Sequence, residues 1–256
     1  MVHKSAMSDT TSSRAELLIA MQREPMLAEC SPTAWEKFID LIQQVDSGQN
    51  HLNLTAIREP LAMVRYHLAD SLALDQVLSE GFSGVEGGRM RCVDVGTGGG
   101  FPLLPMAIAR PDCEWIGVES VAKKAAFVER TAAALGLQNV SLIPQRAEDA
   151  ARTELRGTAD VATARAVGPI ASLAEVCAPF LKTGGVLYLF KTEASRQEWQ
   201  QCESVLQRFG LQPAGEFSYQ LSGDEQNRLI LKARKVEETP DEFPRRAGVP
   251  FKRPMS

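Results

Sequence analysis

Apolar positions in the first third of the chain recur at helical spacing. They are Leu17, Leu18 and Met21 for a first predicted helix, and Trp35, Phe38, Ile39, Ile42 and Val45 for a second. Ser31 as N-cap and Pro32 at the first helical position introduce the second helix, and a third is predicted over Pro60–Leu78. The pattern predicts a helical extension over residues 14–80. Residues 1–13 are polar with no apolar period, which predicts a disordered tail.

Beyond a glycine-rich stretch, from about residue 89 to 235, short apolar runs alternate with helical ones. Strands are predicted over Arg91–Val95, Glu114–Glu119, Val140–Ile143, Val161–Ala164 and Val186–Phe190. Helices are predicted over Phe101–Arg110, Val121–Leu135, Pro169–Leu181 and Ala194–Phe209. Two further runs, Glu216–Leu221 and Arg228–Ala233, are joined by a turn and predict an antiparallel hairpin. The expected fold class is α/β and Rossmann-like, with a mostly parallel seven-stranded sheet that ends in this hairpin.

Composition places the chain among ordinary globular proteins. Of its 256 residues, 44% are hydrophobic and 23% are charged. No run reaches the roughly 20 apolar residues that span a bilayer, and no signal peptide is recognisable, so we expect a cytoplasmic protein with no membrane partner. The five cysteines are scattered and form no C-x-x-C pair, which argues against disulfides and a metal site.

Charge is uneven along the chain. The net charge is -4, but eight basic residues and four acidic ones lie between Arg228 and Arg253. Residues 236–256 are therefore predicted to be a basic C-terminal tail near an RNA face. Because proline and glycine punctuate this tail, we expect no regular structure in it.

A glycine turn follows the first predicted strand, in the string Asp94-Val95-Gly96-Thr97-Gly98-Gly99-Gly100-Phe101. A bare turn before a helix lets a nucleotide-like cofactor approach the backbone. A dinucleotide fingerprint would need glycine where Phe101 stands, which disfavours a Rossmann oxidoreductase. The spacing from Asp94 through Gly96, Gly98 and Gly100 instead resembles the first motif of class I S-adenosylmethionine-dependent methyltransferases.

An acidic residue lies at the end of the next predicted strand. Glu119 stands nineteen residues after Gly100, where a carboxylate can accept both hydroxyls of a ribose. The alternative is a solvated strand-end acid. After the third strand, Ala147 and Glu148 lie where methyltransferases of this class place contacts to adenine, although the string alone could be a polar loop.

Several strings in one order resemble the bacterial RsmG (GidB) family of small-subunit ribosomal RNA guanine-N7 methyltransferases. They are Asn53-Leu54-Thr55-Ala56-Ile57, His67-Leu68-Ala69-Asp70-Ser71-Leu72, the glycine turn, Arg165-Ala166-Val167 and the terminal string from Phe243 to Pro254. The resemblance runs from about residue 30 to the end. It implies that S-adenosylmethionine donates a methyl group to N7 of a guanine in the decoding-region loop of 16S ribosomal RNA, leaving S-adenosylhomocysteine.

The resemblance also implies cofactor contacts, at Gly96, Phe101, Ala147, Glu148 and Arg165. This chain departs from the family at three positions. The family usually has Asp where Glu119 stands, often Gly where Leu103 stands, and commonly Lys-Gly where Lys191 precedes Thr192. The substrate-side role of Lys191 is the one most affected.

The chemistry at guanine N7 needs no general base, because its in-plane lone pair is free at neutral pH. Alignment of the two reactants is then the main source of catalysis. Arg165, at the end of the fourth predicted strand, is the candidate that orients cofactor or base. The alternative for Arg165 is an ordinary salt bridge to Asp94 or Glu148.

Candidate RNA contacts fall in two regions. They are Asn53, Arg58 and His67 in the extension, and Lys191, Arg228, Arg245, Arg246, Lys252 and Arg253 toward the C-terminus. The alternatives are a solvated tail and, for His67 with Asp70, a hydrogen-bonded pair. The expected partner is 16S ribosomal RNA or the small subunit, and the expected state is a monomer. Rival functions are a methyltransferase for another RNA or small molecule, and a non-catalytic RNA-binding module.

Overall fold

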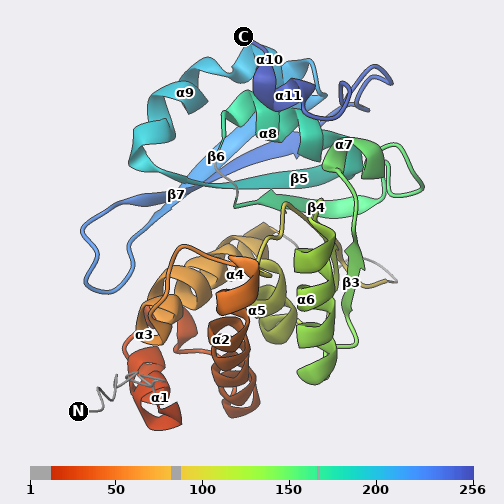
Figure 1. Ribbon diagram of the computed structural model, residues 1–256. Coiled ribbons are helices and arrows are strands. Elements are labelled where there is room, and N and C mark those ends of the chain that lie inside the picture. Colours follow the sequence, from red (N-terminus) through yellow and green to blue (C-terminus); the bar gives the residue numbers. More distant parts are fainter. Residues whose placement is uncertain (1–12, 82–87, 166–167) are drawn as a thin grey trace, which may run out of the picture.

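A seven-stranded sheet forms the middle of three layers in the computed structural model, which describes residues 13–81, 88–165 and 168–256 (Figure 1). Helices α4, α5 and α6, with α1 to α3 beyond them, lie on one face of the sheet. Helices α8, α10 and α11 lie on the other face. The predicted disordered tail, apart from Ser13, and the motif residues Ala166 and Val167 lie outside the described residues.

The strand order is β3-β2-β1-β4-β5-β7-β6. The strands are β1 (Arg91–Val95), β2 (Glu114–Val118), β3 (Val140–Ile143), β4 (Ala159–Ala164), β5 (Leu181–Thr192), β6 (Leu211–Tyr219) and β7 (Arg228–Lys235). Strands β1 to β5 pair in parallel, and β7 is antiparallel to both β5 and β6. The predicted mostly parallel sheet with a C-terminal hairpin is confirmed. Strand β6 starts five residues earlier than predicted, because an exposed edge strand carries little apolar alternation.

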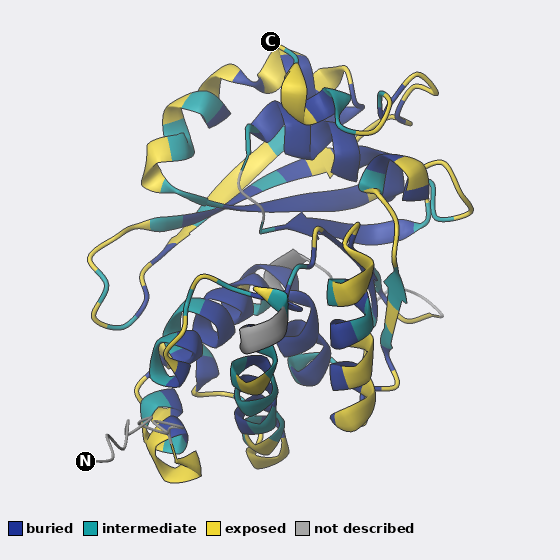
Figure 2. Ribbon diagram, viewed as in Figure 1, coloured by how far each residue is buried: buried dark blue, intermediate teal, exposed yellow. Residues whose placement is uncertain are grey.

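Each strand sends alternate side chains into one of two cores. In β1, Cys92 belongs to the core shared with the N-terminal helices, while Val93 and Val95 belong to the core shared with α8. Burial on both faces explains why the central strands read as short, nearly continuous apolar runs. Figure 2 shows these strands buried along their length, with the exposed residues on the outer helix faces.

The N-terminal helices are α1 (Arg14–Gln22), α2 (Pro32–Leu52), α3 (Pro60–Met63) and α4 (Asp70–Gly81). Ser13 and Ser31 cap α1 and α2 through their hydroxyls, as expected for helix starts. Helix α2 runs seven residues past the predicted Val45, because no proline interrupts it before Asn53 ends it in the left-handed conformation. A π-helical turn (Val64–Ala69) joins α3 to α4, so the third predicted helix is continuous but locally widened.

The helices of the α/β part are α5 (Leu103–Ala109), α6 (Ala122–Ala134), α7 (Ala147–Ala150), α8 (Ile170–Cys177), α9 (Arg196–Gln201) and α10 (Glu203–Gln207). All four predicted helices of this part are shorter than expected, and the last two differ most. Helix α8 gives way to a 3-10 turn (Ala178–Phe180), because Pro179 has no N–H to donate. The helix predicted over Ala194–Phe209 is broken at Cys202 into α9 and α10, after a 3-10 turn (Glu193–Ser195).

The C-terminal segment differs from its prediction. It contains a short helix, α11 (Val249–Lys252), which packs against α8 (Figure 1). Gly248 precedes it with a φ of 79°, and Pro250 lies in its first turn, so the residues taken as breakers start the helix. The expectation of no regular structure was wrong here.

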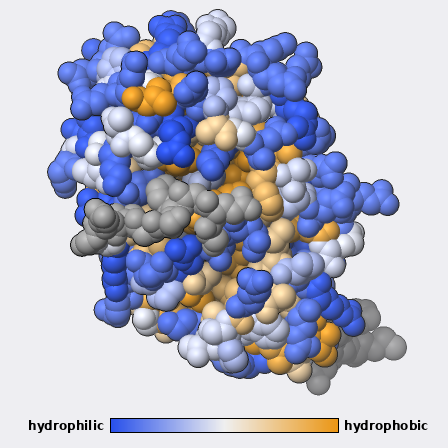
Figure 3. Space-filling model, turned by 180° about the vertical axis from the view of Figure 1, so that it is seen from behind, coloured by the Kyte–Doolittle hydropathy of each residue, from blue (hydrophilic) through white to orange (hydrophobic). Residues whose placement is uncertain are grey.

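The face opposite to that of Figure 1 is largely hydrophilic toward its upper and lower ends, with apolar side chains gathered across its middle (Figure 3). Within the described ranges, no helix combines the length and apolar character needed to cross a membrane.

Candidate functional site

The glycine turn joins β1 to α5 at the carboxyl edge of the sheet. Strand β1 lies between β2 and β4, so the order of strands reverses here, and ligands of α/β sheets bind in the crevice at such a position. Gly96, Gly98 and Gly100 have φ values of 77°, 57° and 95°, which side chains with a Cβ rarely adopt. A Cβ on Gly100 would also lie 2.6 Å from Leu104 Cδ1. The turn therefore keeps its backbone bare.

Asp94 lies beneath this turn as a buried carboxylate. In the described part of the chain no donor meets hydrogen-bond geometry with either oxygen, and the nearby Thr97 hydroxyl and Leu103 N–H only partly offset the effect of burial on its pKa. Burial raises the pKa of Asp94 to about 6. An unpaired buried carboxylate costs free energy, so a cationic ligand would gain by binding it. The amino group of the predicted donor is such a cation.

Glu119 extends from the end of β2 toward the same turn. Its Oε2 accepts a hydrogen bond from the Gly98 backbone N–H at 2.9 Å, and its Oε1 accepts one from the Val121 N–H at 2.7 Å. These bonds hold the side chain in place and leave lone pairs on both oxygens. The carboxylate can therefore still accept ribose hydroxyls, and the role predicted for it is geometrically available.

A pocket of about 120 Å³ lies beyond the ends of β1, β2 and β3. It brings together the predicted cofactor residues Gly96, Ala147 and Glu148. Its other lining residues are Val95, Val118, Ser120, Gln145, Arg146, Leu173, Val176 and Phe251. Apolar walls with a few polar groups are typical of small-molecule sites.

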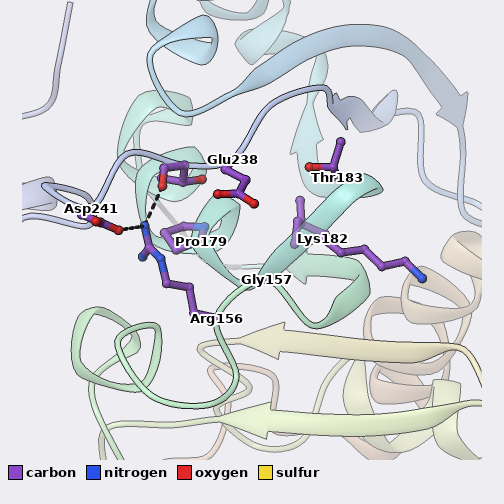
Figure 4. Close-up of a pocket in the computed structure, with 9 residues that line it drawn as sticks. Arg156, Gly157, Pro179, Lys182, Thr183, Glu238 and Asp241 are labelled. Carbon is purple, nitrogen blue, oxygen red and sulfur yellow. Dashed lines mark hydrogen bonds and ion pairs between the residues drawn. The ribbon is translucent and has the colours of Figure 1, made fainter.

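A larger cavity, of about 430 Å³, lies at the opposite edge of the sheet (Figure 4). Arg156 lines it and donates to the carbonyls of Thr239 and Phe243, while Lys182 points away from Arg156. The cavity adjoins the segments that precede β4 and β5, whereas α/β sheets bind ligands at the carboxyl ends of their strands. Arg156 therefore fastens the C-terminal segment, and the chemistry belongs to the smaller pocket.

Arg165 follows β4, which pairs with β1 on the side opposite to β2. Its Nη1 donates to Asp70 Oδ2 at 3.0 Å and to the Tyr66 carbonyl at 3.1 Å, and its Nη2 lies 3.2 Å from His67 Nδ1. The alternative of a salt bridge to Asp94 or Glu148 was wrong in its partners. The guanidinium is held by the helical extension instead.

Asp70 is the centre of this arrangement. Its buried carboxylate accepts from Arg165, from the Tyr219 hydroxyl at 2.8 Å and from Arg228 Nη1 at 3.4 Å. Burial raises the pKa of Tyr219, so the phenol remains a neutral donor. One carboxylate thus joins the start of α4, the end of β4 and both strands of the hairpin.

His67 and Phe101 form the apolar side of the same cluster. Their rings stack with centroids 4.5 Å apart, and the Arg165 guanidinium lies 5.6 Å from the Phe101 centroid. Burial, together with the charge of Arg165, lowers the pKa of His67 to about 3. Nδ1 lies 3.2 Å from Arg165 Nη2, which can only donate, and 3.1 Å from the Tyr66 carbonyl, which can only accept, while Nε2 lies 2.6 Å from Thr55 Oγ1. His67 and Asp70 are thus linked through Arg165, not directly.

Comparison with known proteins identifies the family. A family model described as rRNA small subunit methyltransferase G matches residues 34–222. A protein of that name from Streptococcus pyogenes serotype M1 is 37% identical over 222 residues, which is 86% of this chain and 91% of the relative. This chain belongs to that family. Its relative from Desulfitobacterium hafniense (strain Y51) is 34% identical over 241 residues, 94% of this chain and 97% of the relative.

Solved structures were also found to be similar. One is a point mutant of the 16S rRNA (adenine(1408)-N(1))-methyltransferase from Catenulisporales acidiphilia, at 21% identity and a TM-score of 0.47, covering 59% of this chain and 87% of that one. Another is M. jannaschii TYW2 in complex with AdoMet, at 16% identity and a TM-score of 0.49, covering 64% and 76%.

The family's sheet, a class I methyltransferase fold, carries several of the predicted RNA contacts at its carboxyl edge. Lys191, at the end of β5, donates to the Gly168 carbonyl, and burial lowers its pKa. Arg228 is held by Asp70 and Asp224. In the extension, Arg58 and Asn53 are exposed and share a hydrogen bond of 3.3 Å.

The four cations of the C-terminal segment separate into two kinds. Arg245 is committed to the fully buried Glu175, with bonds of 2.6 to 3.1 Å from its guanidinium. Arg246, Lys252 and Arg253 are exposed, and none of them forms an ion pair in the described ranges.

Sequence reasoning missed Tyr219 and Phe251, and gave Asp70 no partner but His67. Tyr219 comes from the hairpin, 149 positions after Asp70, and no local spacing relates the two. Phe251 lies in the terminal string beside Lys252 and Arg253, and these basic residues led to a prediction of RNA binding for the string as a whole.

Proposed function

We propose that this family member transfers the methyl group of S-adenosylmethionine to N7 of a guanine in the decoding-region loop of 16S ribosomal RNA. The observation that carries the proposal is the arrangement at the carboxyl ends of β1 and β4, where the order of strands reverses. It has a bare glycine turn over an unpaired buried carboxylate on one side, and Arg165 on the other. Family membership supports the methyltransferase reading over an oxidoreductase or a non-catalytic RNA-binding module.

The residues available for the donor divide by chemistry. Asp94 would hold its ammonium, Glu119 its ribose hydroxyls, and the pocket with Ala147 and Glu148 its adenine. Gly96, Gly98 and Gly100 give it access to the backbone of the turn. When bound, the donor supplies an electrophilic methyl group on a positively charged sulfur. The ring of Phe101 packs on His67, so Phe101 would support the turn from below.

The chain's own contribution is positioning. Guanine N7 attacks through a free lone pair, so no residue has to remove a proton. His67 agrees with this, because a pKa of about 3 makes its ring a poor proton acceptor. Arg165, held by Asp70 at the mouth of the crevice, would orient the incoming base. Two well-aligned reactants can gain about 7 to 11 kcal/mol from alignment.

The RNA would reach the crevice across the carboxyl edge. Lys191 and Arg228 flank that edge, and the exposed cations Arg58, Arg246, Lys252 and Arg253 would bind phosphates around it. We further propose that the protein acts as a monomer in the cytoplasm, where ribosomal subunits are assembled. Light scattering of the purified protein measures its molar mass and so tests whether it is a monomer.

The decisive experiment compares two substrates. The protein is incubated with isotope-labelled S-adenosylmethionine and either undermethylated small subunits or protein-free 16S RNA, and the product is mapped by mass spectrometry. We expect one 7-methylguanosine in the decoding-region loop. An Arg165→Ala variant should bind the donor but transfer the methyl group at least tenfold more slowly. A methyl group on another atom, or none at all, contradicts the proposal.

A further inference from the structure

We propose that the C-terminal segment, residues 243–253, completes the adenosine pocket through Phe251, so that cofactor binding and RNA binding are coupled through one segment. The inference rests on the proposed function and adds a residue and a coupling to it. It begins from the pocket beyond β1, β2 and β3, where Phe251 is the single lining residue from the C-terminal segment. The other lining residues belong to the sheet edge, the loops after it, α7 and α8.

The segment is fastened before and within Phe251's helix by bonds to buried groups. Arg245 binds the fully buried Glu175 through its guanidinium and its backbone N–H. The Gly248 N–H donates to Glu148 Oε1 at 2.7 Å. The buried hydroxyl of Ser172 donates to the Pro250 carbonyl at 2.7 Å. Three anchors within six residues fix α11 against α8.

Glu148 has a double role in this arrangement. It lines the pocket, and it is also the acceptor that holds Gly248. A carboxylate has capacity for several donors, so Glu148 can serve the segment through Oε1 and a ligand through its other lone pairs. The position of the segment and the shape of the pocket therefore depend on the same side chain.

Phe251 presents an aromatic ring where an adenine is expected. Its side chain is 42% exposed, although it is a large apolar residue in a helix that buries Pro250. Exposure of an aromatic ring at a pocket wall costs little if a flat base covers it, and a base stacked on such a ring gains substantially. The ring also contacts Gly168, whose added Cβ would lie 3.0 Å from Phe251 Cε1. Gly168 in turn accepts from Lys191 at the RNA edge.

The next two residues, Lys252 and Arg253, are exposed cations. Phosphates bound by them would hold α11 in place over the pocket, and an adenosine under Phe251 would hold it from the other side. The two ligands would thus bind one short helix from opposite sides, and any coupling between them through it is reciprocal.

The test is calorimetric titration of the full chain with S-adenosylhomocysteine and, separately, with 5′-methylthioadenosine. Phe251→Ala should lower the affinity for both ligands by the same factor, about five- to a hundredfold, because both contain adenosine. Phe251→Tyr keeps an aromatic ring and should stay within twofold of wild type. Val236→Ala is the matched control, because Val236 is also 42% exposed but does not line the pocket, and it should not change the affinity.

The coupling is measured by repeating the titration with 16S RNA present. In the wild type, RNA should raise the affinity for S-adenosylhomocysteine, and Phe251→Ala should abolish that gain. Wild-type binding without any loss in Phe251→Ala overturns the inference and leaves the proposed function intact. If the wild type binds neither adenosine ligand, both the proposed function and the inference are wrong.

Discussion

The Arg165 guanidinium donates to the carboxylate of Asp70 at 3.0 Å, across 95 positions of the chain. Arg165 follows the strand at the switch point, and Asp70 begins the helix that leads from the extension. The bond means that the helical extension does more than cover the sheet. It sets the position of the arginine at the mouth of the crevice.

Asp70→Asn should therefore slow methyl transfer without weakening the binding of the cofactor. The amide keeps the shape but removes the charge that holds Arg165, and small displacements of a positioning group cost up to about a hundredfold in rate. We expect kcat to fall about 10- to 100-fold while the dissociation constant of S-adenosylhomocysteine changes less than twofold. Steady-state kinetics with small subunits and calorimetry measure the two quantities.

The matched control is Glu114→Gln, which removes the carboxylate of the surface pair with Arg91 at 2.8 Å. An exposed pair contributes only about 0 to 1 kcal/mol, so its kcat and melting temperature should stay near wild type. Equal kinetic effects of Asp70→Asn and Glu114→Gln would show that Asp70 has no positioning role.

Asp94→Asn should stabilise the fold and weaken the binding of S-adenosylmethionine. Burial raises the pKa of Asp94 from 3.8 to about 6, so the unfolded chain loses this proton at lower pH than the folded protein does. The stability cost of Asp94 is thus absent below pH 4 and grows as the pH rises to about 6. At pH 7.5 the variant should gain about 1 to 3 kcal/mol in free energy of unfolding.

Urea unfolding at pH 7.5 and pH 4 measures this gain, which should vanish at the lower pH. Calorimetry should show at least tenfold weaker S-adenosylmethionine binding, because Asn cannot pair with the ammonium. Unchanged affinity with increased stability would mean that Asp94 does not contact the donor.

His67 should make the fold sensitive to mild acid. Burial and Arg165 lower its pKa from 6.5 to about 3, so the unfolded state binds a proton at a pH where the folded state does not. Its stabilising contribution is complete above pH 6.5 and is lost as the pH falls toward 3. Between pH 7 and pH 5, wild type should lose about 1 to 2 kcal/mol more than His67→Gln. Parallel stability curves for the two proteins contradict this assignment.

The cations of the C-terminal segment should behave differently from one another. Arg253→Ala should leave the melting temperature unchanged and reduce the log-log salt slope of RNA binding by about 0.7. Arg245→Ala leaves Glu175 buried without its charge partner and should cost about 2 to 4 kcal/mol in stability. Filter binding over a salt series and thermal melts distinguish the two. If Arg245→Ala changed the salt slope of RNA binding and Arg253→Ala did not, Arg245 and not Arg253 would be the RNA contact.

Local patterns were sufficient where local physics decides. The predicted β1 and β3 match the observed strands at both ends, because buried parallel strands are short apolar runs between polar turns. The turn of Gly96, Gly98 and Gly100 was also readable, since only glycine takes these φ values without strain. Helix ends were less readable. The start of α11 depends on Gly248 being fixed by Glu148, which lies 100 positions earlier.

The sequence by itself determined the sheet, the glycine turn, Glu119 as a strand-end acid and the family, because each is written in residues close together in the chain. Only the tertiary structure decided that Asp70 holds Arg165, that Arg245 is committed to Glu175 while Arg253 is exposed, and that Phe251 lines the pocket. These relations join residues about 70 to 160 positions apart. Charge and size alone do not select one partner among many, so packing of the folded chain selects it.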